Sequence, residues 1–259
     1  MKRCLMILIS AGATAVSHGG TIVHMNRTDF DGKTRPEAVL YAQEGQFRMD
    51  TLDADGHVSN FVLVRDGSVW QVDVPKRTFF EIDQAALAGQ QSQMQEQMQA
   101  MLQRLPPDQR AAMEERMKGL MAGRSQFSLT MTDTGKTDHV GSWDCEVWQV
   151  RRSGAVSSDA CIASRGSLAG GDELVDAVHK AAAVTKDVVS ALPGARATAQ
   201  QMAVYGKVDG FPVRTRQLGS DGSVESAETV SSVERQSLPA DRFAIPKGFT
   251  QTTLGGGHE

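Results

Sequence analysis

Between residues 21 and 83, hydrophobic and polar side chains alternate with the two-residue period of β-strands. In the stretch GQFRMDT, Phe47 and Met49 alternate with charged residues, and in SVWQVDV the residues Trp70 and Val72 alternate with polar ones. This alternation is typical of an antiparallel sheet that buries one face and exposes the other to water. The pattern therefore predicts strands whose apolar face is covered by another part of the chain.

Turn signals divide this region into short strands. Asp55-Gly56 and Asp66-Gly67 are typical of β-hairpin turns, and Pro75 is expected to end a strand before the short run RTFFEID. We therefore predict an antiparallel meander of about six strands.

From residue 84 to 122 the period changes to that of an α-helix. The segment QSQMQEQMQAMLQRL is followed by two prolines and by DQRAAMEERMKGLMAG, which predicts two antiparallel helices. Each helix has a stripe of methionines on one face: Met94, Met98 and Met101 on the first, Met113, Met117 and Met121 on the second. Methionine side chains adapt to irregular surfaces, so the stripe can belong to a static core or to a movable cover.

The remainder of the chain predicts strands from 126 to 164, a helix from 172 to 192, and two strands in FPVRTRQL and SVESAETVSSVE. Strands and helices do not alternate regularly, so parallel β-α-β units are not expected. The predicted class is α+β: a single curved antiparallel sheet of about 10–11 strands, covered by the helical hairpin 84–122 and by the third helix. Residues 18–250 form one domain, and the tail 251–259 is expected to be disordered.

The first 17 residues resemble a secretory signal peptide. Lys2 and Arg3 precede the apolar run CLMILISAGATAV, and small residues follow at the position of a cleavage site. The run has about a dozen residues, whereas a membrane-spanning helix needs ~20, so a membrane anchor is the less favoured alternative. We predict an exported, periplasmic protein that does not span the membrane once processed.

Charge and composition exclude several kinds of partner. Removal of Lys2 and Arg3 changes the formal net charge from −4 to −6, and no later segment concentrates Lys and Arg. Nucleic acid is therefore not an expected partner, because phosphate binding needs a concentrated basic surface.

Two cysteines, Cys145 and Cys161, remain after the signal segment. They lie in two predicted strands that are joined by a turn at Ser153 and Gly154, so a hairpin closing there places them opposite each other. An even cysteine count in an exported protein also favours a disulfide. The alternatives are two reduced, buried cysteines or, less favoured, a metal site.

Several stretches together resemble a known bacterial exported family, the domain of unknown function 4412. They are GQFRMD, DGSVWQVDVPKRTFFEID, GSWDCEVW and LPADRFAIPKGF. The resemblance implies a relation to the outer-membrane lipoprotein carrier (LolA-like) fold, an open half-barrel of antiparallel strands with helices across its concave side. It implies no activity.

No catalytic constellation is visible in the sequence. The six histidines have no zinc-helix spacing, no G-x-S-x-G motif exists, and no pair of acidic residues can be nominated as acid and base. We therefore expect neither an enzyme nor a cofactor, and we name no catalytic or metal-binding residue.

Three functions remain. The first is a binding or carrier module for a hydrophobic ligand such as an acyl chain, held by Phe47, Trp70 and Val72 under the methionine-bearing hairpin. The second is an envelope interaction or sensor protein whose hairpin meets another protein. The third is Cu(I) binding by thioether sulfurs of the methionine stripe, since these are soft ligands.

Overall fold

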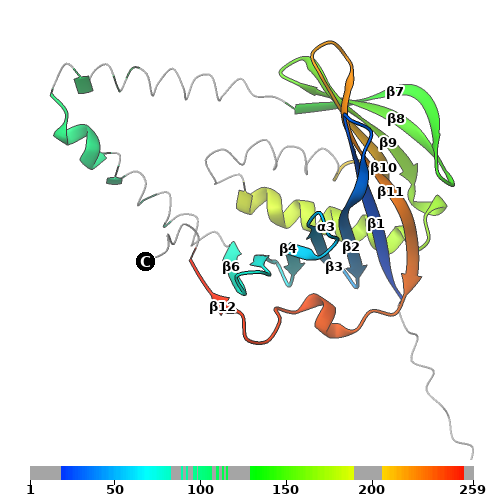
Figure 1. The fold of residues 1–259 in the computed structure, drawn as a ribbon, viewed down its shortest axis with the longest axis horizontal. Helices are drawn as coiled ribbons and strands as arrows, with labels where there is room; N and C mark the ends of the chain where they lie inside the picture. Colours follow the sequence, from blue (N-terminus) through cyan, green and yellow to red (C-terminus); the bar gives the residue numbers. More distant parts are fainter. Residues whose placement is uncertain are drawn as a thin grey trace, which may run out of the picture.

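The structure is a computed structural model that describes residues 19–82, 129–189 and 206–253, together with short pieces between residues 89 and 115. The predicted signal segment, the end of the tail and most of the helical hairpin lie outside the described residues. Within these ranges the chain is mostly β, with one long helix (Figure 1).

Twelve strands form one open sheet. The first six are β1 (Gly20–Asp29), β2 (Thr34–Gln43), β3 (Gln46–Leu52), β4 (Val58–Arg65), β5 (Ser68–Asp73) and β6 (Thr78–Ile82). The others are β7 (Leu129–Val140), β8 (Trp143–Arg152), β9 (Ala155–Ser164), β10 (Gly210–Leu218), β11 (Val224–Gln236) and β12 (Thr250–Gln251). The predicted meander of six strands is therefore confirmed.

The strand order joins the two halves of the chain through β1 and β11. It runs β12-β6-β5-β4-β3-β2-β1-β11-β10-β9-β8-β7, and all neighbours are antiparallel except the short pair of β12 with β6. The prediction of a wholly antiparallel sheet of 10–11 strands thus missed β12. This strand has two residues, Thr250 at the end of the predicted domain and Gln251 at the start of the predicted tail, and it is too short for a periodic pattern to reveal.

The predicted turns form where glycine permits a left-handed backbone. Asp66 and Gly67 have φ values of 52° and 81°, the combination required by the tight hairpin between β4 and β5. Ser153 and Gly154, with φ of 49° and 88°, repeat this combination between β8 and β9. Gly56, with φ of 82°, is the left-handed residue of the longer turn between Asp53 and His57.

The long helix α3 (Gly171–Val189) confirms the helix predicted from 172. It lies across the concave side of the sheet in Figure 1, and it buries its apolar stripe against β1, β2, β3 and β10. Leu174 and Val175 are almost completely buried there. Among the described residues, no helix combines the length and the apolar character that crossing a bilayer requires.

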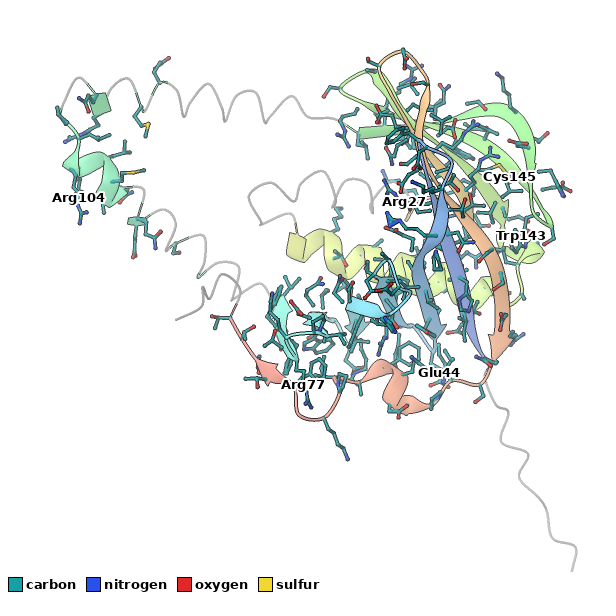
Figure 2. The ribbon with its side chains drawn as sticks, in the orientation of Figure 1. Arg27, Glu44, Arg77, Arg104, Trp143 and Cys145 are labelled. Atoms are coloured by element: carbon teal, nitrogen blue, oxygen red, sulfur yellow. A yellow bond between two sulfur atoms is a disulfide. The ribbon has the colours of Figure 1, made fainter. Side chains whose placement is uncertain are left out.

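Part of the other face of the sheet is covered by residues 238–249, which we call the C-terminal strap. Figure 1 shows it running beneath β2 to β6. Its Phe243 is 2% exposed and packs with Phe61, Leu63 and Val72 in a second hydrophobic cluster. At the end of the strap, the Arg77 guanidinium lies 5.9 Å from the Phe249 ring centroid (Figure 2).

The strap corrects the expectation that the sheet has one wet face. Arg48 and Asp50, which the alternating pattern placed in water, are 8% and 1% exposed. Their ion pair, 2.5 Å between Nε and Oδ1, lies under the strap, and Arg48 also donates to the Arg242 carbonyl at 3.0 Å. Charged residues can occupy a buried face when each finds a partner, and the periodicity does not report this.

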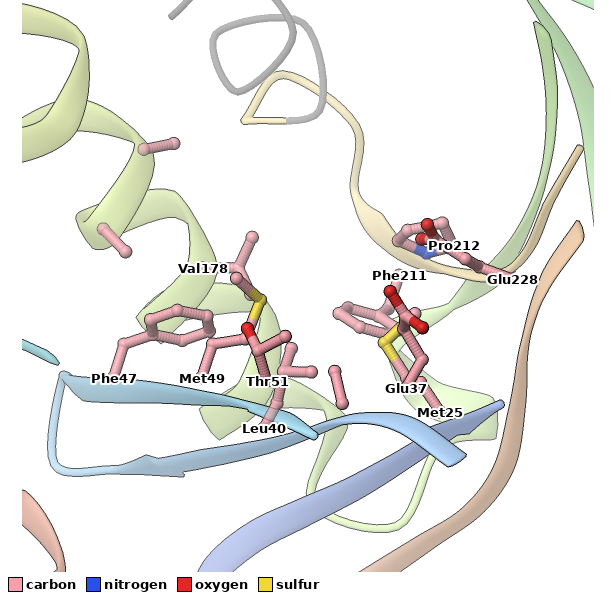
Figure 3. A pocket seen from close by; sticks show the side chains of 13 residues that line it. Met25, Glu37, Leu40, Phe47, Met49, Thr51, Val178, Phe211, Pro212 and Glu228 are labelled. Carbon is pink, nitrogen blue, oxygen red and sulfur yellow. The ribbon is translucent and has the colours of Figure 1, made fainter. Parts of the chain in front are cut away.

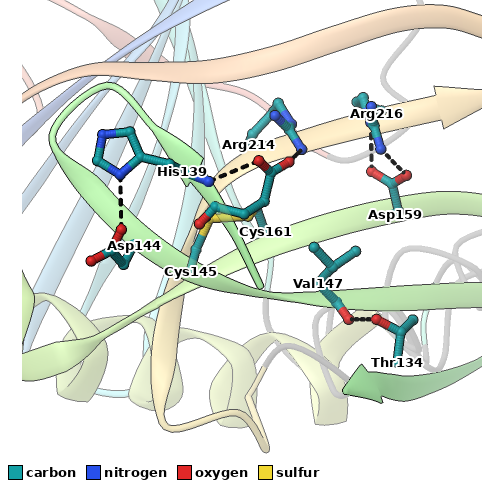
Figure 4. The surroundings of a disulfide bond; sticks show 10 residues. Thr134, His139, Asp144, Cys145, Val147, Asp159, Cys161, Arg214 and Arg216 are labelled. Atoms are coloured by element: carbon teal, nitrogen blue, oxygen red, sulfur yellow. Dashed lines mark hydrogen bonds and ion pairs between the residues drawn. A yellow bond between two sulfur atoms is a disulfide. The ribbon is translucent and has the colours of Figure 1, made fainter. Parts of the chain in front are cut away.

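The predicted disulfide joins Cys145 of β8 to Cys161 of β9, with a Cα–Cα distance of 5.3 Å. Ion pairs surround it on the same part of the sheet: Arg214 contacts Asp138 at 2.6 Å and Arg216 contacts Asp159 at 2.7 Å (Figure 4). The bridge therefore ties two neighbouring strands near the free edge of the sheet, which β7 forms.

Candidate functional site

A cavity of about 300 Å³ lies between α3 and the concave face of the sheet (Figure 3). Its walls come from five strands, β1, β2, β3, β10 and β11, and from the helix, and most of the lining residues are apolar. The lining residues are Met25, Glu37, Ala38, Leu40, Phe47, Met49, Thr51, Val178, Ala181, Ala182, Phe211, Pro212 and Glu228.

The sheet side of the cavity follows from the period of β3. Phe47, Met49 and Thr51 are alternate residues of this strand, so their side chains point to the same side, toward α3. Cross-strand pairing places Leu40 opposite Met49 and continues the apolar wall onto β2.

The helix side has little side-chain volume. Val178, Ala181 and Ala182 lie on one face of α3, at the spacings that bring helical residues together. Both alanines are at least 95% buried and yet border the cavity. Small residues here leave an unfilled space between helix and sheet, whereas larger ones would close it.

One end of the cavity is polar. Figure 3 shows Glu37 and Glu228 near Met25, Phe211 and Pro212, with Phe47 at the opposite end. The pairing of β1 is irregular near this end. Its register against β11 shifts between His24 and Met25, and its register against β2 shifts between Met25 and Asn26. Such irregularities re-aim side chains, and they allow glutamates to reach an apolar wall.

The two glutamates interact electrostatically. Burial raises the pKa of Glu228 above its ordinary value, the nearby Glu37 carboxylate raises it further, and Arg27 opposes both effects. Arg27 Nη1 is 3.8 Å from Glu228 Oε1, and Arg35 Nη1 is 3.7 Å from Glu37 Oε2. Neither distance is that of a short hydrogen bond, so the carboxylates keep oxygens that a ligand can approach.

Of the three sheet residues predicted to line the site, the structure places only Phe47 in the cavity. Val72 is fully buried in the opposite cluster under the C-terminal strap, and Trp70 packs beside it. Trp70 pairs with Leu63 on that same face, whereas Val69 is the residue of β5 that joins the cluster around Phe47. The prediction put Trp70 and Val72 on the wrong side of the sheet, because the apolar set of β5 packs under the C-terminal strap and the alternating pattern does not show which face a distant segment covers.

The methionine stripe falls mostly beyond the described residues. Met94, Met98, Met117 and Met121 lie outside them, so their predicted packing against the sheet stays a prediction, as does copper binding. Met101 is described and is 52% exposed, and Met113 is half-buried. Figure 2 shows Arg104, three residues beyond Met101, apart from the sheet. Met101 is therefore not a core residue.

The methionines that do border the cavity are Met25 and Met49. Met49 alternates with charged residues just as Phe47 does, so the period of the strand could have identified it. Met25, Phe211 and both glutamates carried no such signal, because β-bulges break the period around them and pairing with distant strands brings them together.

Three histidines of the described residues have polar neighbours that offer no site. Asp53, Asp55 and His57 lie close together, but the Asp53 carboxylate accepts the backbone N–H groups of the other two, which forms an ordinary turn. His139 pairs with Asp144 at 2.8 Å on the exposed strand edge. On the helix, His179 Nε2 lies 3.0 Å from the Val208 carbonyl oxygen.

Comparison with known families and structures gives one family match. The model of the family described as "Domain of unknown function (DUF4412)" matches residues 90–249. A comparison with curated proteins finds no match.

Several solved structures are similar in arrangement. An uncharacterised conserved protein from Thermus thermophilus has 12% identity and a TM-score of 0.44, covering 91% of this chain and 90% of that one. The MucA/MucB complex of Pseudomonas aeruginosa has 10% identity and a TM-score of 0.34, covering 90% of this chain but 56% of that one. A LolA superfamily protein from Nitrosomonas europaea has 8% identity and a TM-score of 0.28, with coverages of 87% and 89%.

Proposed function

This chain belongs to the DUF4412 family, and because that name assigns no activity, we propose a function from the cavity. The protein is an exported, periplasmic module that binds or carries a hydrophobic ligand such as an acyl chain, and it catalyses no reaction. The ligand lies between α3 and the concave face of the sheet, in contact with Phe47, Met49 and Leu40.

The observation that carries the proposal is an apolar cavity left open by two alanines. Its volume of about 300 Å³ is at the small end of known ligand pockets, which suits one narrow chain. Each methylene removed from water contributes roughly 0.8 kcal/mol before the costs of association are subtracted, so a medium-length chain can bind measurably.

The disulfide supports export. Cysteine pairs persist in oxidising compartments and are rare in the cytosol, and Cys145 and Cys161 are bonded in the structure. The N-terminal segment with its Lys-Arg start and apolar run supports the same location.

Filling the cavity tests the proposal. Ala182→Phe places a ring in the cavity, whereas Ala183→Phe, one residue further along α3, places the same ring in solvent. Titration with a neutral fluorescent probe, N-phenylnaphthylamine, should show saturable binding by the wild type and by Ala183→Phe. Ala182→Phe should reduce the affinity by at least about tenfold, equivalent to 1.4 kcal/mol.

Two further results complete this test. Native mass spectrometry of protein purified without detergent should reveal a bound small molecule in the wild type and not in Ala182→Phe. If Ala182→Phe unfolds from overpacking, the smaller Ala181→Val serves instead. Unchanged probe affinity in a folded, cavity-filled variant would contradict the proposal.

The interaction or sensor function remains a second candidate because of Met101. An exposed methionine on a helical surface is adaptable and can meet a partner protein. A partner that co-purifies with the full chain and is lost on removal of residues 84–122 would favour this function. Retention of the same partner by the shortened chain would argue against it.

A further inference from the structure

The charged side chains at the polar end of the cavity are both carboxylates. Among the described residues that line it, the ionisable ones are Glu37 and Glu228, and none carries a positive charge. Resting on the proposed function, we propose that this end selects amphiphiles whose head group is cationic and donates hydrogen bonds, and that it discriminates against free carboxylates.

The neighbouring arginines do not cancel this preference. Arg27 is held by Asp29 at 2.7 Å, much closer than the 3.8 Å to Glu228. Arg35 is shared between Asp29, at 3.6 Å, and Glu37, at 3.7 Å. The three carboxylates outnumber the two guanidinium groups, so the cluster keeps one negative charge in excess.

The arrangement matches the length of an amphiphile. Phe47 lies at one end of the cavity and the two glutamates at the other, with Leu40 and Met49 between them (Figure 3). A hydrocarbon tail lies along the apolar side chains and its head reaches the carboxylates. An ammonium group there forms charge-assisted hydrogen bonds, whereas a carboxylate meets like charge at two partly exposed glutamates.

The ionisation of Glu228 adds to the discrimination. Burial and Glu37 raise the pKa of this carboxyl, and Arg27 lowers it by less, so ionisation of Glu228 is less favourable than that of a fully solvated glutamate. A bound cation favours this ionisation, and a bound anion opposes it. An ammonium head therefore stabilises the ionised form of Glu228, which its surroundings disfavour.

Three probes with the same tail and different heads test the inference. Dodecylammonium, dodecanol and dodecanoate, each below its micelle concentration and near neutral pH, are titrated against bound N-phenylnaphthylamine. We expect dodecylammonium to displace the dye with an affinity at least about tenfold higher than dodecanoate, with dodecanol between them.

Neutral isosteres identify the groups responsible. The double variant Glu37→Gln/Glu228→Gln should bring the amine and the acid to within about twofold of each other and leave dodecanol unchanged. The matched control is Glu146→Gln/Glu225→Gln, which removes the same charge from two exposed glutamates on β8 and β11. This control should retain the full preference, and its thermal unfolding confirms that folding is intact.

The outcomes separate this inference from the proposed function. If dodecanoate binds as well as dodecylammonium, or if both double variants lose the preference equally, the head-group selection is wrong while the hydrophobic site stands. If none of the three probes displaces the dye from the wild type, and Ala182→Phe is also without effect, both proposals fail.

Discussion

Cys145 and Cys161 are bonded although they are not directly opposite each other in the sheet. Cys145 pairs with Ala163, and Cys161 pairs with Val147, so the bridge joins diagonal neighbours. The register shifts between Val150 and Arg151, close to the turn, and displaces one strand against the other. The symmetry of the two cysteines about residue 153 predicted the disulfide correctly. It also predicted that the two residues pair directly across the strands, which is wrong.

Removal of this disulfide should destabilise the protein by about 3 kcal/mol, because the bridge closes a loop in the unfolded chain. Chemical denaturation of the Cys145→Ala/Cys161→Ala variant measures the loss. Before reduction, alkylation should leave both cysteines unmodified, and the mass should be two hydrogens below that of the reduced chain. Full labelling of Cys145 in folded, exported protein would contradict the bond.

The buried pair of Arg48 and Asp50 should be a large contributor to stability. Asp50→Asn leaves the Arg48 guanidinium without a counter-charge under the strap, and removal of one member of a buried pair typically costs about 3–5 kcal/mol. Asp66→Asn is the control, since its partner Arg65 is 3.2 Å away and Asp66 is 83% exposed. We expect about 1 kcal/mol or less there. Equal losses in urea unfolding would mean that the strap does not exclude water from Arg48.

The C-terminal strap should stabilise the fold without shaping the cavity. Phe243→Ala truncates a ring that is 2% exposed and should cost about 3–5 kcal/mol. Phe30→Ala, at an 87% exposed position, should change stability by no more than about 0.5 kcal/mol. Because Phe243 lies on the opposite face from α3, the folded variant should keep its affinity for the fluorescent probe. A loss of probe binding equal to that of Ala182→Phe would show that the two faces are coupled.

The sequence predicts the order of elements well, since that order depends on local signals. Period-two alternation located the strands around Phe47 and Trp70, glycine turns separated them, and a helical period located α3. It could not show that residues 238–249 return to cover part of the second face. That contact joins positions about 200 residues apart, and it places Arg48 and Asp50 in the core although their residue types suggest a solvent-exposed strand.

The same limit explains the candidate site. Phe47 was identified because it belongs to an apolar face, but the face of Trp70 was assigned wrongly because the alternating pattern does not show which face a distant segment covers. Glu37 and Glu228 are separated by most of the chain and meet through the pairing of β1 with β2 and with β11. In a sequence, a single glutamate on a strand is expected at the surface. Only the pairing of β2, β1 and β11 in the folded sheet brings these two glutamates to one cavity.

The pH dependence of stability should reveal the environment of Glu228. Its pKa is raised above the ordinary 4.5 by burial and by Glu37, and is lowered less by Arg27. The folded state therefore holds this proton more tightly than the unfolded state, so the contribution of Glu228 to stability falls as pH rises from 4.5 through the raised pKa. Above that range the ionised carboxylate destabilises the fold.

Glu228→Gln removes this penalty. Its melting temperature should exceed that of the wild type near neutral pH, and the difference should shrink toward zero as the pH falls to about 4, where the wild-type carboxyl is protonated. Glu225→Gln, an exposed position on the same strand, controls for the change in net charge. Thermal unfolding followed by circular dichroism from about pH 4 to about pH 8 provides the comparison. A variant less stable than the wild type near neutral pH would mean that Arg27 stabilises the ionised carboxylate more than burial and Glu37 oppose it.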